Sequence, residues 1–439
     1  MSSVLKKEIG LLTGVAFVTG GVIGMGAFVL IPLICAKAGG SAWFSISVAL
    51  MASILGVFPL IQLSAAYPVA GGGYTYGKIF FGNDIGMIFG LWAVIGGSAG
   101  VALVSFGLAQ SFIEALHLDI SAHLFSLGIV VLFWLIFHSG LKTLASLQNI
   151  LVAQMLLSLL IYGIPMLLKG PFNVSWKCPT FNNDFFISIL FSFNISMGFQ
   201  IIIEFGEEMK NPSRNIPLAL IIGGGIIWLI YILMSAAYIS AVGEEQLQVH
   251  PELVSTANGV LPEWLQGFIR LGIISAGLTC FVGAGVAIPR EILAMARDKV
   301  IPNSLAYISA RGTPVHATNL FFILVCGFLL LGEVFAQTGV LAYFFERDEI
   351  EFYGFLSILG LMTLGGGVSL SSLFLKRKMP DAYAKAYIRF KPYALNILVV
   401  LSVTTSILLI VLISSKWIIP LIFFAITCVG LFTSKLIKI

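Results

Sequence analysis

The segment Gly20–Phe28 holds residue types that can free a backbone for ligand binding inside an apolar stretch. It reads GGVIGMGAF, so four of its first seven residues are glycine, the weakest helix former after proline. A break in a membrane-spanning helix exposes N–H and C=O groups, which bind a charged ligand without a charged side chain. Glycines of this kind also mark close helix packing, so this segment alone leaves both interpretations open.

A second segment, Phe191–Gln200, reads FSFNISMGFQ and points to the first interpretation. Ser192, Asn194 and Ser196 occupy every second position, and Gly198 follows. A period of two does not form a helical face, and polar groups at membrane depth face the protein interior. Paired interruptions in two halves of a chain indicate a transporter site at the middle of the membrane. We therefore predict that both segments are unwound and form one substrate site.

Charged side chains beside the second segment are candidates for coupling or gating. Glu204 lies deepest in an apolar stretch, where acids are candidates for function by default. It is either a proton-linked or gating carboxylate or the structural partner of a cation such as Arg290. Glu207 and Glu208 lie nearer the end of the stretch and form a possible inward gate. Their expected partners are Lys210, Arg214 and Arg297.

The composition places these segments in a membrane. The chain has 439 residues, 59% hydrophobic and only 10% charged, with a mean hydropathy of +1.03, whereas soluble domains carry about 25% charged residues. We expect an integral membrane protein. The five cysteines are scattered without CxxC spacing, and neither HExxH nor paired His and Asp occurs. The sequence thus predicts no metal site, cofactor, enzyme or nucleic-acid partner.

Twelve apolar runs reach the ~20 residues that a spanning helix needs. The expected spans are roughly 10–36, 42–66, 84–113, 121–138, 146–168, 184–208, 217–242, 266–296, 315–335, 353–375, 392–414 and 417–435. Short loops join them, so we predict an all-α membrane protein with a single transmembrane domain over residues 1–435. As a straight helix the uncharged run Ile9–Ala36 would measure about 42 Å against a hydrocarbon core of ~30 Å, which leaves room for a break.

The loop charges predict the orientation in the membrane. With the N-terminus inside, 18 of the 24 Lys and Arg residues fall on the cytoplasmic side and 6 outside. Both termini are therefore expected in the cytoplasm. The basic segment Lys376–Lys391 reflects this same bias or contacts anionic lipid headgroups of the bilayer.

Four motifs resemble those of the amino acid–polyamine–organocation (APC) superfamily of secondary transporters, over roughly residues 8–375. They are GMGAF at Gly24–Phe28, YPVAGGGYTYG at Tyr67–Gly77, EEMKNPSRNIPLA at Glu207–Ala219, and REILAMARD at Arg290–Asp298 followed by Ile301–Pro302 and Arg311–Pro314. They occur in the family's order with matching span counts between them. Within the superfamily, the pattern is similar to bacterial amino acid permeases and exporters, which implies a location in the bacterial inner (plasma) membrane.

The resemblance implies a LeuT-type fold of two inverted five-helix repeats plus two added helices. The repeats would cover about residues 10–168 and 184–375, and the added helices about 392–435. It also implies that a substrate carboxylate meets the N–H groups of Met25 and Gly26, and its ammonium group the carbonyls of Val22, Asn194 and Met197. The predicted substrate-binding residues are Val22, Ile23, Gly24, Met25, Gly26, Asn194, Ile195, Met197 and Gly198.

Three positions depart from the family pattern that the sequence resembles. Met25 replaces a small Ser or Thr, so the carboxylate pocket is more crowded or more apolar. Asn194 stands where a large aromatic gate is common, and Gln200 replaces an acid of the sixth span.

The coupling ion is not fixed by the sequence. Some family members carry a fifth-helix lysine in place of a sodium ion, and Gln154 or Met155 matches that position here. Ser275 and Thr279 either contribute to a sodium site or bond back to their own helix. Proton coupling, sodium coupling, uniport and exchange all stay open, as do transport direction and oligomeric state.

The function predicted from these features is secondary transport of amino acids by alternating access. Met25, Ile195, Met197 and Phe199 offer apolar walls, and no carboxylate stands beside the two segments, which favours a neutral, apolar amino acid. One alternative is a basic amino acid or polyamine exchanger. An alternative of another class is a transport-inactive amino acid sensor or a subunit of a larger complex.

Overall fold

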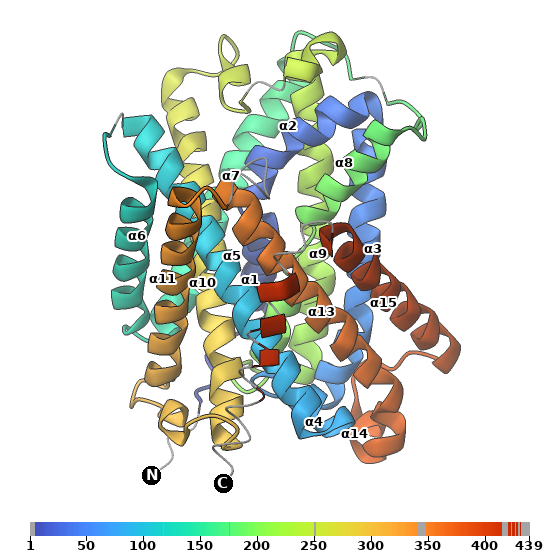
Figure 1. Cartoon of the computed structure of the whole chain (residues 1–439). Helices are drawn as coiled ribbons and strands as arrows, with labels where there is room; N and C mark the ends of the chain where they lie inside the picture. The colour runs from blue at the N-terminus through green and yellow to red at the C-terminus, as the bar shows by residue number, and fades with distance from the viewer. Residues whose placement is uncertain are drawn as a thin grey trace.

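The structure is a computed structural model of a helical bundle (Figure 1). It describes residues 5–116, 118–174, 176–249, 252–340, 348–414, 420–422, 424, 425, 427, 428 and 431. Across this part of the chain the regular structure is helical, and extended pairing is limited to two isolated bridges, Ile9 with Met209 and Ala70 with Phe205.

The bundle is built mainly from long helices. They are α3 (Ala42–Ala66), α5 (Asn83–Leu116), α7 (Leu141–Lys169), α9 (Pro212–Val242), α10 (Glu263–Arg297), α11 (Val315–Gln337), α13 (Asp348–Lys378) and α15 (Pro392–Ser414). The shorter helices are α1 (Leu11–Ile23), α2 (Gly26–Ala38), α4 (Gly72–Phe81), α6 (Ala122–Phe137), α8 (Asn183–Asn194) and α14 (Pro380–Lys385). The 3-10 segments are η1 (Gly39–Ser41), η2 (Phe199–Glu204), η3 (Glu244–Val249), η4 (Ser255–Ala257) and η5 (Asn303–Ala306).

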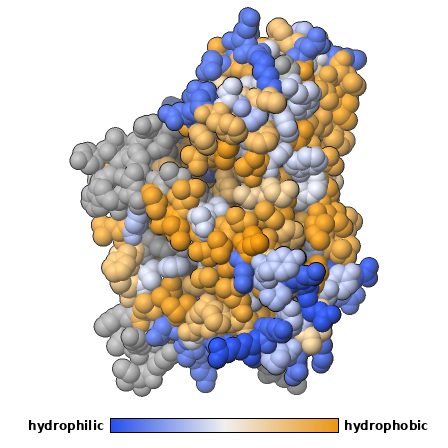
Figure 2. All heavy atoms as spheres, turned by 90° about the vertical axis from the view of Figure 1, so that its right-hand side faces the viewer, coloured by the Kyte–Doolittle hydropathy of each residue, from blue (hydrophilic) through white to orange (hydrophobic). Residues whose placement is uncertain are grey.

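The lengths and composition of these helices are those of an integral membrane protein. Among the described residues, eight helical stretches are long and apolar enough to cross a membrane, and three shorter apolar helices accompany them. Figure 2 shows apolar side chains across the middle of one face and hydrophilic ones towards its two ends. Helices occur at eleven of the twelve expected spans, and the twelfth, 417–435, lies largely outside the described residues. The count of twelve and the inverted repeat stay predictions.

The centre of the bundle is formed by α5 and α10, each with 67% of its most apolar window buried. Glycines allow a close crossing between α5 and α13: a Cβ atom on Gly360 would lie 2.7 Å from the Cα of Gly96. Real Cβ atoms do not approach a neighbour so closely, so this crossing needs a small residue on both helices.

Both predicted helix breaks are present. The first span divides into α1, which ends at Ile23, and α2, which begins at Gly26. Gly24 between them has a φ of 42°, a conformation that side chains with a Cβ rarely adopt. In the sixth span α8 ends at Asn194, and the chain resumes only as the 3-10 segment η2 after Gly198, whose φ is 113°. The sequence did not predict that the second half would be 3-10 rather than α-helical.

Candidate functional site

The first break leaves unpaired backbone donors at the start of α2. The carbonyl of Met25 accepts the N–H groups of Phe28 and Val29. Within the part of the chain that the structure describes, the N–H groups of Met25, Gly26 and Ala27 have no hydrogen-bond partner. Met25 and Gly26 are only half-buried. Unpaired N–H groups at a helix N-terminus carry partial positive charge and bind anions, so this end of α2 is suited to a carboxylate.

Carbonyl groups at the two breaks are joined by one side chain, Tyr231 of α9. Its hydroxyl contacts the carbonyl oxygen of Val22 at 3.2 Å and that of Ile195 at 2.6 Å. A hydroxyl donates one proton, so the two carbonyls share a single donor. Each oxygen therefore keeps free capacity to accept a further hydrogen bond, such as one from an ammonium group.

Side chains of α7 and α10 support the carbonyl groups of α1. The Thr279 hydroxyl lies within hydrogen-bond distance of two carbonyl oxygens, that of Gly20 at 3.0 Å and that of Ala276 in its own helix at 2.8 Å, which share its single proton. Gln148 donates through Nε2 to the carbonyl of Ala16 at 3.3 Å. The Thr279 hydroxyl thus bonds back to its own helix, one of the two interpretations above, and also braces the first break.

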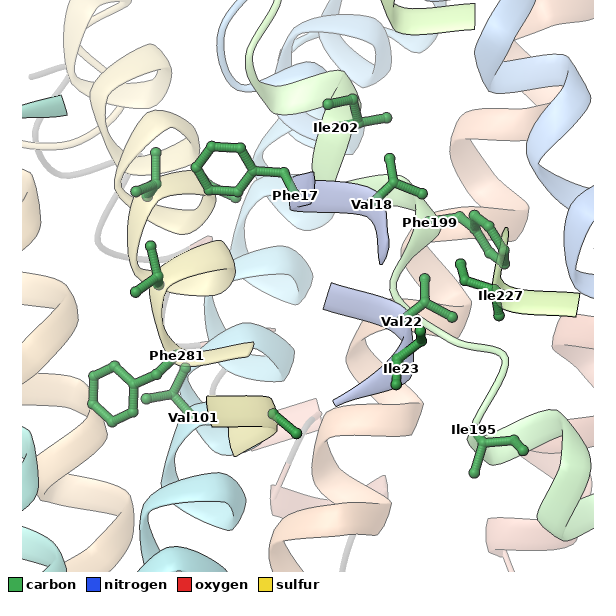
Figure 3. Close-up of a cluster of buried hydrophobic side chains, with 14 of the residues drawn as sticks. Phe17, Val18, Val22, Ile23, Val101, Ile195, Phe199, Ile202, Ile227 and Phe281 are labelled. Atoms are coloured by element: carbon green, nitrogen blue, oxygen red, sulfur yellow. The ribbon is translucent and has the colours of Figure 1, made fainter. Parts of the chain in front are cut away.

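The two breaks lie directly against each other. A Cβ atom on Gly198 would stand 2.6 Å from the carbonyl oxygen of Gly21, and one on Gly26 would stand 2.8 Å from a methyl carbon of Ile195. In Figure 3, Val22 lies near Phe199 in an apolar cluster. The structure thereby brings together six of the nine predicted binding residues, Val22–Gly26 and Ile195. Met197 and Gly198 follow Ile195 closely in the chain.

The wall around the breaks is apolar and uncharged. The terminal methyl of Met25 reaches towards α5, where a Cβ on Gly107 would lie 3.8 Å away. Asn194 is exposed and Met197 half-buried. No Asp or Glu occurs in residues 20–28, 193–200, 99–113 or 271–283. These segments form the first break, the second break and the adjoining parts of α5 and α10.

A small cavity lies on the other side of the second break. Its volume is about 50 Å³, and its lining includes Met197 and Gln200 of the break, Ser53 of α3, Gly365 of α13 and Thr405 of α15. The side-chain atoms Gln200 Nε2 and Ser53 Oγ are buried there without a hydrogen-bond partner. Ligand pockets span about 300–1,000 Å³, so this cavity has room for water but not for an amino acid.

The charged candidates lie at one end of the bundle and form two ion pairs. Glu207 pairs with Arg297 at 2.8 Å, as predicted. Glu208 binds Arg290 through both carboxylate oxygens, at 2.7 and 2.8 Å. The expected partners of Glu208, namely Lys210, Arg214 or Arg297, were therefore wrong, because its side chain is buried in the interior against Arg290 and only 1% exposed.

Glu204 is separate from these ion pairs. Its expected structural partner, Arg290, is occupied by Glu208, so that interpretation was wrong. The carboxylate instead accepts the N–H of Gly72, at the first residue of α4, at 2.8 Å. Its residue is 5% exposed. The sixth span thus connects to the YPVAGGGYTYG motif through a buried side chain.

Sequence reasoning missed two residues that these contacts single out. Tyr231 lies in an apolar span and was not predicted to have a role, although a buried hydroxyl at membrane depth needs a hydrogen-bond partner. Glu291, whose carboxylate accepts the N–H groups of Gly73 and Tyr74 at 2.7 and 2.9 Å, follows Arg290 directly. Glu291 lies as deep in an apolar helix as Glu204. The argument that acids within a membrane span are candidates for function would have found Glu291 too.

Comparison with known proteins identifies the family of the chain. A family model described as amino acid permease matches residues 9–434. An uncharacterised transporter of Mycobacterium tuberculosis is 26% identical over 352 residues, covering 77% of this chain and 78% of the relative. The branched-chain amino acid permease BcaP of Bacillus subtilis is 25% identical over 400 residues, covering 86% and 82%.

A more distant group of relatives comes from plants. The cationic amino acid transporter 3 (mitochondrial) of Arabidopsis thaliana is 24% identical over 392 residues, which are 83% of this chain and 62% of the relative. The family model covers nearly the whole chain, including both breaks and the four motifs. The chain therefore belongs to the amino acid permease family of the APC superfamily.

Proposed function

We propose that this permease transports neutral, apolar amino acids by alternating access, with the substrate held between the two helix breaks. The observation that carries the proposal is the pairing of opposite backbone charges at one place. The three unpaired N–H groups at Met25–Ala27 are suited to a substrate carboxylate, and the carbonyls of Val22 and Ile195, which share one donor, are suited to an ammonium group. One zwitterion satisfies both sets.

The proposed contacts follow the predicted set. The carboxylate binds Met25 and Gly26, with Ala27 as an added donor, and the ammonium group binds carbonyls among Val22, Asn194, Ile195 and Met197. Ile23, Gly24 and Gly198 shape the two turns. We expect the substrate side chain to lie against Met25 and Met197.

The neutral character of the walls supports an apolar substrate. A cationic side chain buried in the protein needs a carboxylate partner, and the segments around the breaks contain none. The relative named for branched-chain amino acids fits this proposal. Transport of basic amino acids is the second candidate, because the plant relatives are named cationic amino acid transporters.

For the transport cycle we propose that the ion pairs Glu207–Arg297 and Glu208–Arg290 close one end of the bundle. Both pairs join the turn after η2 to α10. From the distribution of Lys and Arg we expect this end, with both termini, to face the cytoplasm of a plasma membrane. Opening of the bundle towards the cytoplasm then requires either that the two ion pairs break or that both pairs move together as one body.

Proteoliposomes test the proposal directly. Purified permease is reconstituted, and uptake of labelled leucine, methionine and arginine is measured at equal concentration, with and without an imposed proton or sodium gradient. We expect uptake of leucine and methionine well above that of arginine. Preferred uptake of arginine would overturn the substrate assignment, and specific binding without flux of any amino acid would indicate a sensor or complex subunit.

A further inference from the structure

A pair of buried carboxylates holds the start of α4. Glu204 Oε2 accepts the N–H of Gly72 at 2.8 Å, and the two oxygens of Glu291 accept the N–H groups of Gly73 and Tyr74 at 2.7 and 2.9 Å. Glu204 is 5% exposed and Glu291 0%. Because these three N–H groups are consecutive in the chain, the two carboxyl groups lie side by side at the start of α4. We call Glu204, Glu291 and these three N–H groups the carboxyl clasp.

The clasp joins three elements that belong to different parts of the fold. Glu204 ends η2, which follows the second break, and Glu291 lies in α10. The start of α4 packs tightly against α10, because a Cβ atom on Gly71 would stand 2.4 Å from the Cβ of Ala294. Separating η2 from α10 or α4 therefore breaks the clasp.

No cation of the described chain neutralises the clasp. The charged and titratable groups around it are Tyr67 before α4; Tyr74, Tyr76 and Lys78 on α4; Asp84 on α5; Glu207 and Glu208 after η2; Arg290, Arg297 and Asp298 on and after α10; and Lys378 on α13. The cations among them are engaged elsewhere. Arg290 binds Glu208, Arg297 binds Glu207, Lys78 binds Asp298, and Lys378 binds the carbonyls of Ile79 and Phe80.

Two buried carboxyl groups on consecutive N–H groups, without a cation, favour binding one proton between them. If both were ionised, their like charges would repel each other strongly in the protein interior. When one group is protonated, its O–H can donate to the other group, and the remaining oxygens still accept the N–H groups of α4. An arrangement with one proton therefore carries a single negative charge, which the N-terminus of α4 stabilises.

We propose that the carboxyl clasp is a proton-dependent latch on the gate at this end of the permease. With the shared proton in place, η2, α4 and α10 are held together and this end stays closed. When the proton leaves, repulsion drives Glu204 from Glu291, releases the N–H groups of α4 and allows this end to open. The identification of this end as a transport gate rests on the proposed function.

Hydrogen–deuterium exchange of the full-length permease in nanodiscs tests the latch without any substrate. Exchange of the amides in residues 71–76 is compared at about pH 6 and about pH 8.5, after correction for the intrinsic pH dependence of exchange, since the interval extends well above ordinary carboxyl pKa values. We expect protection of Gly72, Gly73 and Tyr74 to fall at least about tenfold at the higher pH. Equal protection at both pH values would overturn the proposal.

Glutamine variants distinguish a proton-dependent latch from a helix cap that has only a structural role. In Glu204→Gln, the side-chain oxygen still accepts from Gly72 and the NH₂ group donates to Glu291, so the variant imitates the protonated clasp. We expect it to keep its protection at the higher pH. Glu291→Gln is the second variant. Its amide has a single oxygen for the N–H groups of Gly73 and Tyr74, so we expect one of these two to lose protection at both pH values while the pH dependence disappears. The control Asp84→Asn removes an exposed carboxylate at the start of α5 and should behave like the unmodified protein.

Transport distinguishes failure of the latch from failure of the proposed function. Leucine counterflow should rise with pH in the unmodified permease and become flat in Glu204→Gln. A variant that keeps the unmodified pH dependence of both exchange and counterflow would overturn the latch. Absence of amino acid flux in every protein, with the pH-dependent protection intact, would contradict the proposed function and leave the latch in place.

Discussion

At the scale of single residues, the hydroxyl of Tyr231 is the group on which the geometry of both breaks depends. It is fully buried and reaches one carbonyl in each break. Neither carbonyl has a helical partner, so removing the hydroxyl leaves polar groups unpaired inside the membrane.

We expect Tyr231→Phe to lower leucine transport by about tenfold or more, because loss of a buried hydrogen bond costs about 1–3 kcal/mol. Initial rates of uptake in proteoliposomes measure this. Tyr393→Phe is the control, since Tyr393 is 65% exposed. Equal loss in both variants would show that the effect does not come from the breaks.

Gly198 is the second residue whose replacement has a clear outcome. Its φ of 113° and the 2.6 Å between an added Cβ and the Gly21 carbonyl exclude alanine without a shift of the backbone. We expect Gly198→Ala to abolish uptake, whereas Gly267→Ala, which meets nothing within 4 Å, should retain it. Full activity of Gly198→Ala would contradict the observed contact between the breaks.

Met25 sets the size of the site in our proposal. Met25→Thr removes the part of the side chain that reaches Gly107 and should favour larger amino acids. We expect the ratio of kcat/KM for phenylalanine to that for leucine to rise about tenfold, the usual scale for a change in apolar pocket size. Competition between the labelled substrates measures the ratio. The same change at Met51, which is 58% exposed on α3, should leave the ratio unchanged.

At the scale of elements, the pair Glu208–Arg290 ties the turn after η2 to α10. Its side chains are 1% and 3% exposed, so removal of one partner leaves a buried, unpaired charge. We expect Arg290→Ala to lower the free energy of unfolding by about 3–5 kcal/mol. Lys37→Ala breaks the exposed pair of Lys37 with Asp184 and should cost less than about 1 kcal/mol. Denaturation in detergent, followed by tryptophan fluorescence, compares the two.

The elements themselves were largely predictable from the sequence. Apolar length located the spans, and the glycines at positions 20–26 and 198 located the breaks, because both signals are local. The 3-10 form of η2 was not predictable. The conformation of η2 depends on contacts with a distant part of the chain. These contacts include the hydrogen bond from the N–H of Gly72 to Glu204 and the bridge of Phe205 with Ala70.

At the scale of the whole molecule, the parts of the site that escaped prediction are those formed by long-range contacts. Tyr231 reaches Val22 across 209 positions of the sequence, and Glu291 reaches Gly73 across 218. A single sequence gives residue types and local periods but no such distances. The predicted partners of Glu208 were wrong for the same reason, because its actual partner, Arg290, lies 82 positions away in the chain.

The central claim is that backbone groups of the two breaks hold both charged ends of an amino acid. Equilibrium binding to the purified permease tests it with leucine and two analogues: 3-methylbutylamine, which lacks the carboxylate, and 4-methylpentanoate, which lacks the ammonium group. We expect leucine to bind at least about 100-fold more tightly than either analogue, because each one leaves a set of backbone groups unpaired. An analogue that binds as tightly as leucine would contradict the claim.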